Sequence, residues 1–269
     1  MLCAFAFCAF SQQLNTPQPS PTQELTQNFG LSKIELSYSR PGMKGRTIFG
    51  DLVPYGKVWR TGANQATTLT FGEDVMIGGT KIPAGKYGLL TIPDAYEWTV
   101  IITKQTDVTS PAAYKQDQDV VRVKAKAVDI GFPVETFTIM FGNVTGNSCD
   151  LQIIWDNIAV SIPVTTDVDS KVSAQIKELM ENDNRPYFSA AMYYIESGKD
   201  LNQALAWLEK ATAQNPDAFY MFYQKARVLA KLGKKQEALA VSNKSIELAK
   251  AAKSDDYVAL NIKLQATLK

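Results

Sequence analysis

The apolar residues of this chain follow two different periods, and the change from one to the other falls close to residue 165. From Ser32 to Thr165, short runs alternate apolar and polar residues, as half-buried strands do. From Thr166 onward, the apolar residues recur with the spacing of one face of a helix. We therefore predict an all-β antiparallel domain, sandwich-like or jelly-roll-like, over 32–165, followed by an all-α domain over 166–269.

Local signals support the β assignment. Ile34, Leu36 and Tyr38 alternate with polar residues. Gly78-Gly79 stands between two short apolar runs and predicts a two-residue hairpin. In 121–126, apolar residues alternate with cations, which predicts a strand with one buried face and one solvated face.

The helical part contains an internal repeat. Ala204-Leu205 and Ala238-Leu239 are separated by 34 residues, and each pair follows a glycine that ends the helix before it. This period resembles the tetratricopeptide repeat, a pair of antiparallel helices. The resemblance rests on Ala190, Tyr194, Gly198, Ala204, Leu208, Ala211 and Pro216, and then on Ala226, Leu229, Gly233, Ala238 and Ile246. Helices are predicted at 171–180, 187–197, 201–214, 218–232, 236–251 and 257–268.

Repeats of this kind present a concave face to a protein partner. The aromatic residues Tyr220, Phe222 and Tyr223 are candidates for that face, and packing between helices is the alternative role for them.

The amino terminus indicates export. Residues 1–11 are apolar and end in small residues, as a secretory signal does near its cleavage site. Residues 12–31, rich in Gln, Thr, Pro and Ser toward their start, are expected to form a flexible linker. No stretch reaches the ~20 apolar residues that a spanning helix needs. We expect a secreted or periplasmic protein that does not span the membrane.

Composition excludes several chemistries. The chain has no histidine, which removes Ser-His-Asp and Cys-His nucleophiles and every histidine-based metal site. Of the cysteines, Cys3 and Cys8 lie in the apolar start, so Cys149 alone is expected in the mature domains, as a small core residue. No cofactor and no metal are expected. The net charge of +1 disfavours nucleic acid as a partner.

The segment 38–68 is the candidate for a site. It contains five cations, including Lys57, against the single acid Asp51, and it is rich in glycine and aromatic residues. Guanidinium groups bind carboxylate and phosphate in a forked geometry, and tryptophan or tyrosine rings stack on sugars or on arginine. The predicted ligand-binding residues are Arg40, Lys44, Arg46, Tyr55, Trp59, Arg60 and Asn64. The alternative is that the arginines pair with nearby acids such as Asp51, Glu73 and Asp74, and tie the segment to the sheet.

Parts of this segment resemble a known family. The elements Ser39-Arg40-Pro41-Gly42, Gly45-Arg46 and 58–64 (VWRTGAN), with 82–87 and 97–100, are similar to the bacterial domain family DUF2911. The resemblance covers roughly 32–165. It implies a secreted all-β domain, often followed by helical repeats, and it implies no activity and no catalytic residue.

These features favour a non-enzymatic binding module, with a small anionic or sugar-like ligand on the β domain and a protein partner on the helices. A hydrolase using two carboxylates, such as Asp94 and Glu97 beside Trp98, is an alternative from another class. A purely structural or assembly protein is the third.

Overall fold

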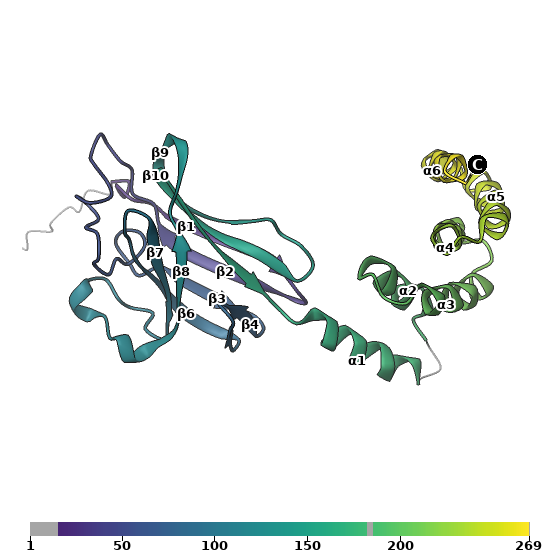
Figure 1. The fold of residues 1–269 in the computed structure, drawn as a ribbon, viewed down its shortest axis with the longest axis horizontal. Coiled ribbons are helices and arrows are strands. Elements are labelled where there is room, and N and C mark those ends of the chain that lie inside the picture. Colours follow the sequence, from purple (N-terminus) through teal and green to yellow (C-terminus); the bar gives the residue numbers. More distant parts are fainter. Residues whose placement is uncertain (1–15, 182–184, 269) are drawn as a thin grey trace, which may run out of the picture. The chain divides into compact units, whose positions relative to one another are not determined.

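The structure is a computed structural model that describes residues 16–181 and 185–268. This part of the chain divides into two compact units, and the boundary between them along the chain falls between Asp169 and Ser170. We call them the β unit and the helical unit and describe each by itself (Figure 1). Residues 1–11, which were expected to be a signal sequence, lie outside the described residues.

The β unit contains two antiparallel sheets. One has six strands in the order β1-β2-β3-β6-β7-β8, and the other has four in the order β5-β4-β10-β9. Alternate residues of both sheets meet in one hydrophobic core, as the period of two predicted. The strands of the first sheet are β1 Thr22–Phe29, β2 Ser32–Ser39, β3 Thr68–Phe71, β6 Gly85–Ile92, β7 Glu97–Thr103 and β8 Asp119–Lys126. Those of the second are β4 Val75–Ile77, β5 Thr80–Ile82, β9 Val128–Gly142 and β10 Ser148–Thr165.

Strand β1 corrects the prediction of a flexible linker over 12–31. Residues 22–29 pair with β2 along their whole length, from Thr22 opposite Ser39 to Phe29 opposite Ser32. The strand is at the edge of its sheet, and all of its residues except Phe29 are exposed or partly exposed. Backbone hydrogen bonds to β2 hold this edge strand in place. The strand therefore does not need a row of apolar side chains, and its sequence shows no apolar period.

The helical unit follows the predicted order of helices, with ends that differ by a few residues. Ala204 and Ala238, the small residues of the repeat, are both fully buried. Within the described residues, no helix combines the length and apolar character needed to cross a membrane. The helices are α1 Val168–Met180, α2 Tyr187–Glu196, α3 Leu201–Gln214, α4 Phe219–Lys231, α5 Lys235–Ala251 and α6 Asp255–Ala266.

A buried polar network joins α5 to α6. Asn261 is fully buried and donates to Ser245 Oγ at 2.9 Å and to the Tyr257 carbonyl at 2.8 Å. Its Oδ1 accepts from Ser242 Oγ at 2.9 Å. Because these groups satisfy one another, the network fixes which faces of α5 and α6 meet.

We predict that Asn261→Ala lowers the free energy of unfolding of the helical unit by about 1–3 kcal/mol, because it removes the partner of two buried hydroxyls. Urea unfolding followed by circular dichroism at the helical band measures the loss. Lys263→Ala, at an exposed position on the same helix, serves as the control and should change stability by less than about 0.5 kcal/mol. Equal effects from the two variants would contradict a structural role for the network.

Candidate functional site

The long segment between β2 and β3, residues 40–67, folds back onto the two sheets. Ile48 and Val53 are buried in the core, and Trp59 exchanges backbone hydrogen bonds with Thr91 of β6, at 2.7 and 3.0 Å. The hydrophobic residues of the segment therefore anchor it to the β unit.

Trp59 is part of an aromatic cluster between the sheets. Its ring stacks on Trp155 with centroids 5.9 Å apart and planes 16° apart. Phe137 and Trp98 meet the same ring edge-on, at 5.1 and 6.4 Å. The indole N–H donates to the Gly62 carbonyl at 3.1 Å. Most of the ring surface is thus used for packing, which leaves little of it for stacking on a sugar.

The structure does not bring the three predicted arginines to one place. Arg40 donates to the Phe137 carbonyl at 3.1 Å and to Thr138 Oγ1 at 2.9 Å. Arg46 donates to the carbonyls of Gly42 and Met43, at 2.7 and 2.9 Å. Arg40 therefore binds β9, whereas Arg46 binds the backbone near the start of its own segment.

Two of the three acids proposed as alternative partners, Glu73 and Asp74, bind other groups. Asp74 pairs with Lys81 at 2.9 Å and accepts from the Ala84 amide. Glu73 accepts from the Leu31 amide at 3.0 Å. Among the ion pairs of the described residues, none joins Arg40, Arg46 or Arg60 to a carboxylate. The arginines of the segment bind carbonyl oxygens instead.

Three further predicted residues each contact a different part of the β unit. Lys44 is exposed and its backbone amide donates to Glu135 Oε1 at 2.9 Å. Tyr55 is 44% exposed and covers Gly50. The Asn64 amide donates to the Ser20 carbonyl at 2.9 Å, just before β1.

Arg60 lines a cavity with a volume of about 260 Å³. Its Nη1 donates to the Thr109 carbonyl at 2.7 Å, while its Nε is buried with no acceptor among the described residues. Lys57 supplies a second cation, and no carboxylate lines the cavity. Of the seven predicted residues, only Trp59 and Arg60 reach this cavity, whose walls also include Leu52, Val53, Val58 and Pro111.

The backbone beside Arg60 is strained. Thr61 has a φ of 56°, a left-handed conformation that is unfavourable for a β-branched residue. It is held there because its fully buried hydroxyl meets that of Thr91 at 3.0 Å and its carbonyl accepts from Thr67 at 2.7 Å. Strain of this kind is concentrated at functional sites, and Thr61 directly follows Arg60.

The second wall of the cavity comes from the loop between β7 and β8, which the sequence reasoning missed. This loop covers the outer face of the larger sheet, where Val108 packs on Leu90 and Ile101. Tyr114 holds its far end by donating to Asp119. Burial and that hydrogen bond raise the pKa of Tyr114 to about 12, so the phenol stays protonated and remains a donor.

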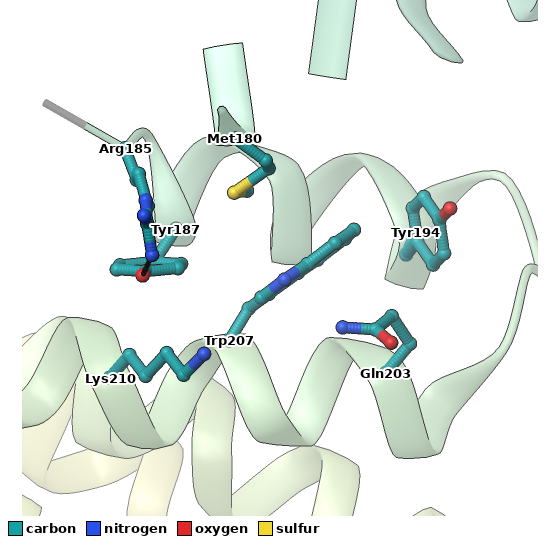
Figure 2. A pocket seen from close by; sticks show the side chains of 7 residues that line it. All are labelled: Met180, Arg185, Tyr187, Tyr194, Gln203, Trp207 and Lys210. Atoms are coloured by element: carbon teal, nitrogen blue, oxygen red, sulfur yellow. Dashed lines mark hydrogen bonds between the residues drawn. The ribbon is translucent and has the colours of Figure 1, made fainter. Parts of the chain in front are cut away.

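The helical unit contains a second cavity, which the sequence reasoning also missed. Figure 2 shows it between α2 and α3, with Trp207 at its centre. The ring of Tyr194 meets Trp207 edge-on at 4.7 Å. The only signal in the sequence was that Trp207 is the single tryptophan of the helical part. Helical periodicity alone assigns such a residue to the core.

The structure also bears on metal binding and on the reactivity of Cys149. Within 16–181 and 185–268, no group of three or more acidic, cysteine or histidine side chains gathers as a metal site would require. Cys149 is 1% exposed, and burial, followed by the nearby charge of Asp150, raises the pKa of its thiol to about 11. The expected role of Cys149 as a core residue agrees with both observations.

The fold and the cavity define a β-sheet protein with a helical extension and a cation-lined cavity in its β unit. The family model described as "Protein of unknown function (DUF2911)" matches residues 20–164, more than half of the chain, and the chain belongs to this family. The match begins before β1, which supports the inclusion of that strand in the domain. Searches of curated proteins and of solved structures found no match.

We predict that Arg40→Met lowers the free energy of unfolding of the β unit by about 1.5–3 kcal/mol, because it removes charge-assisted hydrogen bonds to the Phe137 carbonyl and the Thr138 hydroxyl of β9. Denaturant unfolding followed by tryptophan fluorescence measures this. Lys124→Met on the exposed face of β8 is the control, since its ion pair with Glu97 is solvent-exposed and contributes ~0–1 kcal/mol. A stable Arg40→Met protein would contradict a structural role for Arg40.

We predict that Cys149 does not react with a thiol reagent in the folded protein, because it is buried and protonated. A Cys3→Ser, Cys8→Ser variant isolates this thiol, and Ellman's reagent measures it with and without denaturant. The raised pKa also stabilises the fold below pH 9, and this contribution is lost as pH rises from 9 to about 11. Rapid reaction in the native state would refute the prediction.

Proposed function

We propose that this chain is a secreted or periplasmic binding protein whose β unit holds a small ligand with an anionic group beside Arg60. The observation that carries the proposal is the cavity lined by Lys57 and Arg60 without a carboxylate. Among the described residues, the guanidinium donates to the Thr109 carbonyl through Nη1, and its buried Nε has no acceptor. An anion in the cavity offsets the positive charges of Lys57 and Arg60 and accepts from their exposed donors.

The residues that line the cavity indicate which kind of ligand fits it. Leu52, Val53 and Val58 are apolar and line the same space as the cations, so a ligand with an apolar part beside its anionic group gains from burial. An anion is favoured over a sugar, because the Trp59 ring is packed on Trp155 and Phe137. The ligand residues of this proposal are Lys57, Trp59 and Arg60.

The finer architecture is part of the proposal. Side chains of both sheets share one core, which supports a sandwich. The 34-residue spacing of the buried Ala204 and Ala238 supports tetratricopeptide-like hairpins, α2 with α3 and α4 with α5. On such a scaffold the helical unit would contact a protein partner, and Tyr220, which is 37% exposed, lies on α4 where that contact is expected.

The competing functions fit this cavity less well. A carboxylate-based hydrolase needs two acids facing each other across the site, and the described residues that line the cavity include none. A purely structural role fits Arg40 and Arg46, which tie the segment to backbone carbonyls. It does not account for the two cations at the cavity.

We predict that small anions with an apolar group, such as benzoate or hexanoate, raise the melting temperature of the protein and bind in calorimetry. Arg60→Gln and Lys57→Gln should each weaken binding about tenfold or more, since each removes a charged partner worth ~1.5–3 kcal/mol. Arg46→Gln, which changes a guanidinium outside the cavity, is the matched control. The proposal fails if no anion binds, or if Arg60→Gln and Arg46→Gln behave alike.

A further inference from the structure

The cavity of the helical unit is separate from the site proposed above and has a chemistry of its own. Its volume is about 260 Å³, which is just below the range of small-molecule pockets. That space admits one ring with a short substituent and excludes an extended peptide. Because every lining residue belongs to the helical unit, the cavity exists independently of the β unit.

Aromatic rings form its walls. Trp207 and Tyr187 are 9% and 8% exposed, so packing fixes the rings and leaves only limited surface toward the cavity. Tyr194 meets Trp207 at an interplanar angle of 70°. A rigid surface of this kind suits a flat apolar ring, which stacks or packs edge-on against it.

The charged groups at the cavity are donors. Lys210 and Gln203 approach Trp207 from either side, with their nitrogen ends turned toward it (Figure 2). The Lys210 ammonium lies 5.2 Å from the centroid of the Tyr187 ring, and Arg185 donates to the Tyr187 hydroxyl at 3.3 Å. Two cations thus line the cavity, and among the described residues no carboxylate does.

We propose that this cavity binds an aromatic carboxylate, a flat ring that carries one carboxylate group on a short arm. The ring packs against Trp207, and the carboxylate accepts from Lys210 and from the amide of Gln203. The same chemistry is found in a free aromatic acid and in the last residue of a peptide that ends in phenylalanine. The cavity holds only the ring and its carboxylate arm, so it makes no contact with the rest of a peptide that would distinguish the peptide from a free acid.

The test uses the full chain labelled with ¹⁵N and follows its tryptophan indole N–H signals by NMR. The chain has four tryptophans, and Trp207→Phe identifies the signal of Trp207. Phenylacetate should shift this signal saturably, while the neutral phenylacetamide and the ringless acetate should each bind about tenfold more weakly or worse. Because the cavity of the β unit is itself proposed to take such an acid, the titration is repeated in Arg60→Gln, where an unchanged shift of the Trp207 signal shows that the β-unit cavity is not responsible.

Variants separate the charge from the fold. Lys210→Gln should weaken phenylacetate binding about tenfold without changing the helical circular dichroism. Lys250→Gln, exposed on α5, should have no effect. If Lys210→Gln does not fold, Gln203→Leu tests the same carboxylate, because it removes an amide donor and keeps the apolar stem.

A peptide with a free carboxyl-terminal phenylalanine distinguishes the two sources of the ligand. Tighter binding than phenylacetate supports a chain end as the ligand, and equal or weaker binding supports a free acid. The proposal is overturned if Trp207 does not respond to phenylacetate, if phenylacetamide binds equally well, or if Lys210→Gln and Lys250→Gln bind alike.

Discussion

The β unit depends on one cluster of aromatic rings. The cluster consists of Trp59, Trp98, Phe137 and Trp155, which come from the inserted segment, β7, β9 and β10. Trp59 touches each of the other three, and Phe137 also touches Trp155. Both sheets and the segment between β2 and β3 are therefore joined at a single point. Aromatic side chains bury a large area and hold fixed angles, so the cluster fixes the position of the segment as well as the packing of the sheets.

The position of Trp59 determines what its neighbours do. Trp59 pairs with Thr91 of β6, so the chain is extended there and successive side chains point to opposite faces. The ring enters the core, whereas Val58 packs on the outer face and Arg60 reaches the carbonyl of Thr109. The strained Thr61 then turns the chain. A core residue thus places a cation at the surface cavity.

The sequence predicted elements that depend on local pattern and missed those that depend on distant contacts. Period two, the Gly78-Gly79 turn and the helical repeat describe neighbours along the chain, and the structure contains the corresponding strands and helices. Strand β1 was missed, because an edge strand needs only a partner's backbone. The bonds of Arg40 were missed for a similar reason: its acceptors lie 97 and 98 residues away, and residue type alone does not separate a carbonyl acceptor from a carboxylate or a ligand.

The same limit explains why the cavities escaped the sequence reasoning. The chain carries 28 cations and 27 acids, and this near balance hides the cations that line each cavity, where the described lining residues include no carboxylate. In the β unit, Arg60 follows Trp59 on an extended stretch of chain, and the opposing wall is the loop between β7 and β8. In the helical unit, Lys210 and Trp207 share α3, and the opposing wall comes from α2. The absence of histidine adds a constraint: no imidazole changes its charge between pH 5 and 8. Anion binding should therefore change little with pH near neutrality, and the affinity should fall only at lower pH, where the ligand's own carboxylate is protonated.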